Sequence, residues 1–255
     1  MTMSFLDLRE AAREAVPAAL PQLPHLREAA IETWLGRMRN EHGSARVFEG
    51  LAVQLRAAGL PDLEVERCLA FAEEERYHGV LCGAVVEALG GEALGPALPE
   101  APFPTHPGAS PLEAALRSML SVCCLSETVA VALIGAERLD MPEGPLRELL
   151  TGIYADECGH ANFGWRLLPG LLAQTTASDR AGLEAYLRLA FGHLEAHELS
   201  HLPAEGGFPA EGAALGLCNG ASARGLFYDA VEQVIVPGLQ AAGLDAASAW
   251  RTRHT

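Results

Sequence analysis

Apolar residues recur at spacings of three and four along most of this chain, which is the period of an amphipathic α-helix. Alanine and leucine dominate the composition and runs of β-branched residues are scarce, which also favours helix over strand. Strands are not needed to account for the pattern. We therefore expect an all-α fold, with glycine and proline marking the ends of the helices.

Four long helices followed by two shorter ones are predicted. The third has the clearest start, because Ser110-Pro111-Leu112-Glu113 combines a serine N-cap, a proline at the first helical position and a glutamate placed to close a capping box. The fourth is expected to end at Pro169-Gly170, and a loop rich in glycine and proline at 202–212 separates the last two. The approximate ranges are 25–58, 62–89, 111–139, 146–168, 178–201 and 221–240.

The segment between the second and third helices, residues 91–110, is rich in proline and has no helical period. Extended, it would reach roughly 60 Å, which is longer than either preceding helix. Two helical hairpins joined by one long crossover are therefore expected, rather than a bundle with short loops throughout. We divide the chain into an N-terminal extension (1–26), a four-helix bundle (27–172) and a C-terminal helical extension (173–255) that packs on the bundle or forms a homodimer contact.

Each bundle helix carries an apolar stripe, and an acid interrupts each stripe near its middle. This acid is Glu41 in the first helix and Glu127 in the third. The second and fourth helices each supply a Glu-x-x-His motif, Glu75-Arg76-Tyr77-His78 and Glu157-Cys158-Gly159-His160. Residues three apart lie on one face of a helix, so each motif can present a carboxylate and an imidazole to the same ion.

Four carboxylates in an apolar core would repel one another and lose their hydration unless cations lie between them. A pair of divalent metal ions resolves this conflict, and carboxylates with imidazoles are the ligand set of two-metal helical bundles. We therefore expect a site for two iron ions, with manganese or a mixed manganese–iron pair as alternatives. The predicted ligands are Glu41, Glu75, His78, Glu127, Glu157 and His160.

Other interpretations of these residues remain. A single buried acid can belong to a salt bridge, and Glu49 competes with Glu41 on the first helix, although the face around Glu49 is mostly polar. Asp156 is a candidate for orienting a ligating histidine from the opposing hairpin. Tyr77 and Tyr154 adjoin the motifs, where packing is the simpler explanation.

A second histidine pattern competes with the first. His197-Glu198-Leu199-Ser200-His201 matches the HExxH pattern of zinc peptidases, and His193 extends the histidine row by one helical turn. No third-ligand pattern follows, since Leu202-Pro203 breaks the helix. We interpret this row as solvated or placed between helices.

Charge and cysteine content exclude several classes of function. The chain has 18 Lys and Arg against 33 Asp and Glu, a formal charge of −15, so nucleic acid and anionic membrane surfaces are poor partners. The first residues lack a basic segment followed by an apolar one, and no run is expected to supply the roughly 18 apolar residues of a membrane helix. Six cysteines without a CxxC motif fit reduced thiols in the cytoplasm.

The motifs resemble those of the ferritin-like superfamily, which includes rubrerythrins and oxygen-activating di-iron proteins. The similarity covers about residues 27 to 170 and is greatest to a group of bacterial ferritin-like domain proteins. Departures are glycine for alanine at Gly43 and Gly79, and Glu74 in place of aspartate. The matching segments are Glu41-His42-Gly43-Ser44, Glu74-Glu75-Arg76-Tyr77-His78-Gly79, Glu127-Thr128-Val129-Ala130 and Asp156-Glu157-Cys158-Gly159-His160-Ala161.

The resemblance selects Glu41 over Glu49 and implies a ferritin-like bundle with a di-iron site. The resemblance does not imply one particular reaction. An oxidase or oxygenase that uses dioxygen on a small organic substrate is the first expectation, because ferroxidase sites of ferritins usually lack the second histidine. Iron handling or peroxide scavenging is an alternative, although the rubredoxin module of rubrerythrins is absent. A non-catalytic metal-binding bundle is the third.

Overall fold

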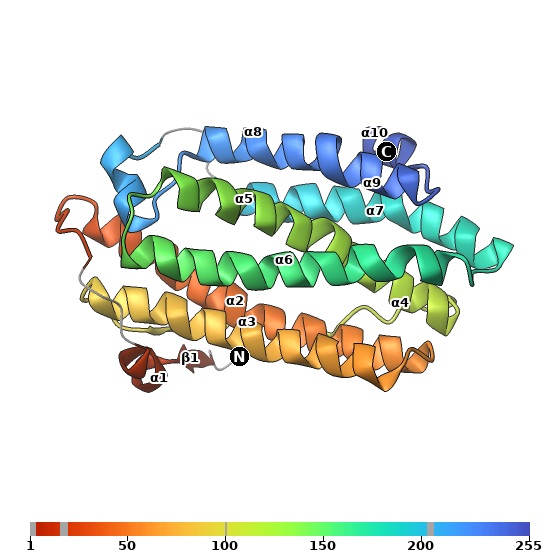
Figure 1. Cartoon of the computed structure of the whole chain (residues 1–255), viewed down its shortest axis with the longest axis horizontal. Coiled ribbons are helices and arrows are strands. Elements are labelled where there is room, and N and C mark those ends of the chain that lie inside the picture. The colour runs from red at the N-terminus through yellow and green to blue at the C-terminus, as the bar shows by residue number, and fades with distance from the viewer. Residues whose placement is uncertain (1–3, 16–19, 100, 203–206) are drawn as a thin grey trace.

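The computed structural model describes residues 4–15, 20–99, 101–202 and 207–255, and most of these are helical. The expected all-α class is confirmed at this level. In Figure 1 the pair α2 and α3 lies on one side of α5 and α6, and α7 to α10 lie on the other side. The bounds of the long helices are Arg27–Ala57 (α2), Asp62–Ala88 (α3), Glu127–Asp140 (α5), Pro145–Leu172 (α6) and Ala177–His201 (α7).

Helices α2 and α3 form the first hairpin, as the sequence predicts. Gly59 ends α2 with a φ of 77°, a left-handed conformation that glycine adopts without a steric penalty. The two helices then approach closely at Gly79, where an added Cβ would lie 2.9 Å from the Cβ of His42. Gly79 therefore allows the close packing of α2 and α3 beside Glu75 and His78, and the alanine usual at this position in the resembled group would not fit unchanged.

The segment after α3 is a long crossover that returns along α2 to the opposite end of the bundle (Figure 1). The amide of Gln54, near the end of α2, donates to the carbonyl of Pro104 over 2.6 Å. One short strand is present in this segment: β2 (Leu94–Pro96) pairs antiparallel with β1 (Phe5–Asp7). The sequence pattern does not require these strands, because two three-residue strands carry too few positions for alternation to be visible in it.

The N-terminal extension is attached to the bundle through this small sheet and through α1 (Arg9–Glu14). Ala12 of α1 is fully buried, and Leu8 donates its backbone N–H to the carbonyl of Ala93 over 2.9 Å. Residues 1–3 and 16–19 of the predicted extension lie outside the described residues.

The predicted third helix starts at Pro111 as expected but consists of three parts. These are α4 (Pro111–Met119), a π-helical turn η1 (Leu120–Ser126) and α5. The Ser110 hydroxyl accepts from the Glu113 N–H at 3.1 Å, whereas the Glu113 carboxylate pairs with Arg117 instead of closing the predicted capping box.

This stretch, Pro111–Asp140, is long and apolar enough to cross a membrane by length and composition, with a mean hydropathy of 1.9 in its most apolar window. The expectation that no such run exists is therefore wrong. The same stretch, however, supplies Leu116, Leu120 and Cys123 to the protein core, where all three are fully buried. Core helices of soluble proteins pass the same test of length and composition.

Helix α6 continues past Pro169 to Leu172, beyond its predicted end. Proline removes only one backbone donor, and the last turn closes through a 3.1 Å bond from the Ala173 N–H to the Pro169 carbonyl. Leu171 and Leu172, each 6% exposed, pack in the core and offset the lost bond.

The C-terminal extension packs on the bundle through α7 and the helices that follow it. A π turn, η3, interrupts the helix predicted at 221–240, and α10 is not among the predicted helices. Glu195 of α7 holds the C-terminal end through its 2.7 Å ion pair with Arg253. Residues 203–206 of the predicted loop lie outside the described residues. The bounds are Ala210–Leu215 (η2), Gly220–Ala230 (α8), Val231–Ile235 (η3), Val236–Ala241 (α9) and Ala246–Arg251 (α10).

The apolar core is divided into two clusters, and the predicted acids lie at the boundary between them. On α2, Met38 belongs to one cluster and Ala45 to the other, with Glu41 between them. On α6, Ile153 and Phe163 flank Glu157 and His160 in the same way. The mid-stripe acids of the sequence therefore mark a polar layer enclosed by two hydrophobic clusters.

Candidate metal centre

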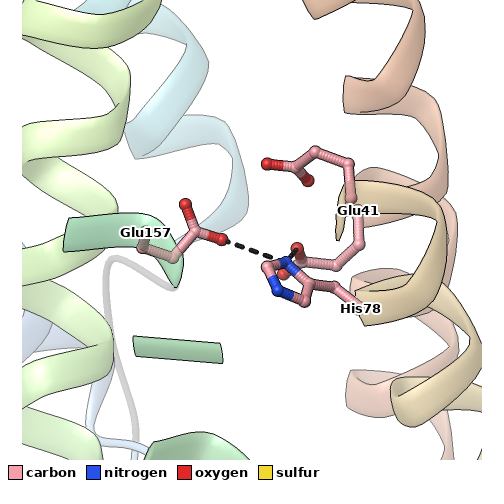
Figure 2. A group of neighbouring side chains, drawn as sticks. Glu41, His78 and Glu157 are labelled. Atoms are coloured by element: carbon pink, nitrogen blue, oxygen red, sulfur yellow. Dashed lines mark ion pairs between the residues drawn. The ribbon is translucent and has the colours of Figure 1, made fainter. Parts of the chain in front are cut away.

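The six residues predicted as ligands come together in the interior of the bundle. Two overlapping groups form, and in each group one candidate ligand atom per residue lies within 4.8 Å of every other. Figure 2 shows how Glu41, His78 and Glu157 approach from different helices. Glu75 and Glu157 belong to both groups. The first group is Glu41, Glu75, His78 and Glu157, and the second is Glu75, Glu127, Glu157 and His160.

Each helix contributes in the way that its sequence pattern predicts. Glu41 comes from α2, and the two Glu-x-x-His motifs come from α3 and α6. Glu127 is the first residue of α5, directly after the π turn η1. A π turn inserts one residue into a helical turn, and such turns occur frequently at functional sites. Here the turn sets the register at which Glu127 enters the cluster.

In the first group, the Nδ1 atom of His78 faces two carboxylates. It lies 3.5 Å from Glu41 Oε2 and 3.4 Å from Glu157 Oε1. His78 is fully buried, while the Glu41 side chain is 18% exposed. This group therefore has one edge open toward solvent, on the Glu41 side.

In the second group, the Nδ1 atom of His160 faces three carboxylates. It lies 3.3 Å from Glu75 Oε1, 3.3 Å from Glu157 Oε2 and 3.7 Å from Glu127 Oε2. His160 is fully buried against the rings of Phe48 and Phe71, with centroid distances of 5.0 and 4.5 Å. This group is the more enclosed of the two.

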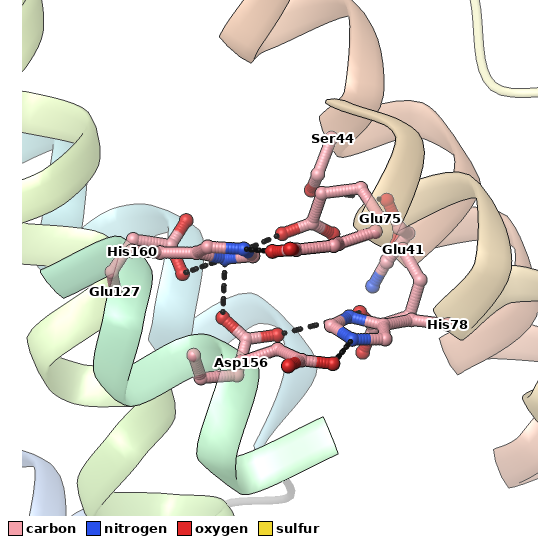
Figure 3. A network of polar contacts seen from close by, with 10 residues as sticks. Glu41, Ser44, Glu75, His78, Glu127, Asp156 and His160 are labelled. Atoms are coloured by element: carbon pink, nitrogen blue, oxygen red, sulfur yellow. Dashed lines mark hydrogen bonds and ion pairs between the residues drawn. The ribbon is translucent and has the colours of Figure 1, made fainter. Parts of the chain in front are cut away.

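The opposite nitrogen of each imidazole is bound by an acid from the other hairpin. His78 Nε2 lies 3.1 Å from Asp156 Oδ2 (Figure 3). His160 Nε2 lies 2.8 Å from Glu74 Oε2. With the proton on Nε2, each ring presents the lone pair of Nδ1 to the cluster, and such outer acids also raise the basicity of a ligating imidazole. Asp156 therefore makes the contact with His78 that orienting this imidazole requires.

Glu74 is the counterpart of Asp156 that sequence reasoning missed. The signal was present, because an acid immediately precedes the glutamate of both Glu-x-x-His motifs. A pattern of acid-Glu-x-x-His on two helices that face each other predicts two reciprocal contacts, since each acid then points toward the histidine of the other helix.

The carboxyl groups are in an environment that opposes their ionisation. Burial, together with repulsion from Glu157 and Glu41, raises the pKa of Glu75 to about 8. Burial and the Glu157 charge also raise the pKa of Glu127 well above its usual value. The pKa of Glu157 is lowered despite its burial, because Glu127 and His160 hydrogen-bond to its charged form and the His78 ring lies beside it. Protons therefore supply the positive charge that this cluster needs.

The histidines show the complementary shift. Burial alone would lower the pKa of His78, but the Glu157 and Glu41 carboxylates raise it to about 11. The pKa of His160 is raised against its burial by Glu127, Glu157 and Glu75. Both rings are therefore cationic in the metal-free protein, and their Nδ1 protons occupy the space in which a cation would bind.

These residues fit a metal centre by their donor chemistry. His78 Nδ1 is buried and has no hydrogen bond of good geometry, although it faces two carboxylates. Oxygen and imidazole donors of this kind suit iron, manganese and zinc. The buried Glu and His group can therefore hold a metal ion, while the number and identity of the ions belong to the proposal below.

The other residues considered for a role at the metal centre do not join the acid cluster. Glu49 points away from the cluster and pairs with Arg76 on the outer face of the α2–α3 hairpin. Tyr77 is 57% exposed, and Tyr154 packs under the guanidinium of Arg138. The rings of the HExxH histidines His197 and His201 meet edge to face with their centroids 4.9 Å apart, and among the described residues no third potential ligand joins them.

The outer acids are expected to control metal affinity. Asp156→Ala and Glu74→Ala should each weaken Mn²⁺ binding by about 10- to 100-fold, because the facing imidazole loses its orientation and its basicity. Asp156→Asn should restore part of the loss, since an amide oxygen still accepts from Nε2–H. Equilibrium dialysis measures the affinity. Glu73→Ala, one residue from Glu74 but exposed, is the control, and equal affinity in all variants would contradict the assignment.

No protein-family model matches this chain, and no curated protein matches it significantly. The functional argument therefore depends on the residues of the site.

Proposed function

We propose that this protein is a ferritin-like di-iron carboxylate protein that uses dioxygen to oxidise a small organic substrate. The main support is the convergence of four carboxylates and two Nδ1 atoms, from four helical segments, in a layer enclosed by two apolar clusters. Two hairpins joined by a crossover along the bundle are the connectivity expected of that class. In this proposal each of two ions would have one imidazole and would share the Glu75 and Glu157 carboxylates.

The residues of the site would hold the metal ions, orient the histidines and exclude water. A bound pair of iron ions would supply the reduction of dioxygen. Glu41 would hold the ion near His78, Glu127 the ion near His160, and Glu75 and Glu157 lie within reach of both. Asp156 and Glu74 hold the protons on the two Nε2 atoms, and Phe48 and Phe71 exclude water from the His160 side.

Iron handling without an organic substrate is the second candidate. The raised pKa of Glu75 and of Glu127 indicates a site that exchanges protons for cations, which iron uptake also requires. The cleft described below favours an organic substrate, because iron entry alone needs no apolar wall. A site that holds zinc without redox chemistry is the third candidate.

Anaerobic loading with ferrous ions followed by exposure to air separates the three candidates. We expect two ferrous ions per chain and, on exposure to air, rapid dioxygen uptake with near-ultraviolet absorbance from ferric ions. Rapid consumption of hydrogen peroxide with little dioxygen uptake would favour peroxide scavenging instead. A protein that binds two zinc ions in preference to iron and shows no absorbance change would contradict the proposed function.

A further inference from the structure

A cleft of about 820 Å³ begins at the acid cluster and extends between α2, α5 and α6 on one side and α7 and α8 on the other. Glu41, Glu75, Glu127 and Glu157 line its inner end. Its volume lies within the range of about 300–1,000 Å³ that small-molecule sites occupy. A small organic molecule can therefore extend from the cluster into this cleft.

The middle of the cleft is apolar. Ala130, Leu133 and Ile134 of α5 form one wall, with Ile153 of α6 and Leu226 of α8 beside them. The three α5 residues follow Glu127 along the same helix, so the apolar wall leads directly away from the cluster. A hydrocarbon chain is the chemistry that this wall suits.

The HExxH segment of α7, which the metal centre leaves unused, also lines the cleft. Its lining residues are His197, Glu198 and His201. Among the described residues no cation or hydrogen-bond donor is recorded against the Glu198 carboxylate, although burial raises the pKa of this half-buried group to about 7. An unpaired carboxylate that lines a partly apolar cleft is suited to a cationic ligand group.

The remaining charged side chains of the cleft are mostly acidic. Outside the cluster its walls carry Glu32, Glu137, Asp140 and Glu198. Arg37 also lines the cleft and carries the opposite charge, but it is paired with Glu137 at 2.6 Å. An anionic ligand would therefore meet uncompensated negative charge, whereas a cation would reduce it.

We infer that this cleft binds a small aliphatic amine, with its ammonium group at Glu198 and its carbon chain along α5 toward the acid cluster. The inference rests on the proposed function, since it places the far carbon of the amine at the metal centre. It assigns a role in ligand binding to a segment whose sequence resembles a zinc peptidase.

The test compares hexylamine with hexanoate, which differ in charge but share a carbon chain. Both are titrated by ligand-observed NMR, in a buffer free of amines, into protein loaded with two equivalents of Mn²⁺. Hexylamine is expected to bind at least about tenfold more tightly, a difference of about 1.4 kcal/mol. Its methyl protons should broaden more than the protons beside nitrogen, because the methyl end lies nearer the manganese.

Glu198→Gln should reduce hexylamine affinity by about tenfold and leave two manganese ions per chain. Glu184→Gln, an exposed glutamate on the same helix, should change neither value. Equal or tighter binding of hexanoate, or unchanged hexylamine affinity in Glu198→Gln, would overturn the inference while leaving the proposed function intact. Tight, Glu198-dependent amine binding by a chain that holds no manganese would instead support the amine site and count against the proposed function.

Discussion

Replacing Glu127 with alanine is expected to leave the protein folded while reducing bound metal to fewer than two ions per chain. Glu127 belongs only to the group around His160, where its Oε2 lies 3.7 Å from the ring Nδ1. Its loss leaves the group around His78 intact. One ion should therefore bind with nearly unchanged affinity, and the other should bind at least about a hundredfold more weakly, since loss even of an outer partner costs 10- to 100-fold.

Metal analysis after dialysis against Mn²⁺ or anaerobic Fe²⁺ gives the stoichiometry, and circular dichroism reports whether the helices remain. Glu49→Ala is the matched control, because Glu49 was the rival acid on α2 but pairs with Arg76 at the surface. It should retain two ions. Two ions per chain in the Glu127→Ala protein would show that the ligand assignment is wrong.

Divalent metal is expected to stabilise the fold strongly. Mn²⁺ at about a thousandfold excess over its Kd should raise the free energy of unfolding by about 4 kcal/mol, provided that it binds only the folded chain. The physical reason is that four carboxylates, three of them buried, are brought together without a permanent counter-ion. Urea unfolding with and without Mn²⁺, after treatment with a chelator, measures the difference.

Replacing Glu75 with glutamine should stabilise the metal-free protein and reduce the further stabilisation by Mn²⁺. The raised pKa of Glu75 means that its stabilising contribution is complete below about pH 4.5 and is lost as the pH rises toward about 8. At neutral pH, glutamine should therefore make the metal-free protein more stable by on the order of 2 kcal/mol. The same variant should gain little from Mn²⁺. A metal-free variant less stable than the wild type, with a full response to Mn²⁺, would contradict the charge argument.

The sequence located the helices and the polar layer because both depend on local periodicity. An acid in an apolar stripe is visible at helical spacing, and the preference for Glu41 followed from the polar surroundings of Glu49. The structure brings Glu41 to His78 and leaves Glu49 at the surface. Convergence of the four helices could be predicted, since a 20-residue crossover fixes which hairpins face each other.

Features that depend on packing could not be predicted in this way. The π turn before Glu127 contains no glycine or proline, so no residue in it marks the change of helical register. Helix α6 passes through Pro169 because tertiary burial of Leu171 and Leu172 outweighs one lost hydrogen bond. The cleft joins α5 to the last turn of α7, and no local pattern indicates that pairing.

The most direct test of the two-metal site is an anomalous difference map from crystals grown with Mn²⁺, recorded at the manganese absorption edge. Two peaks are predicted, roughly 3.5–4 Å apart as in other two-metal sites, one beside His78 Nδ1 and one beside His160 Nδ1. Glu75 and Glu157 should each lie within bonding distance of at least one peak. A map with no peak among these six side chains, in crystals that hold manganese elsewhere, would contradict the account.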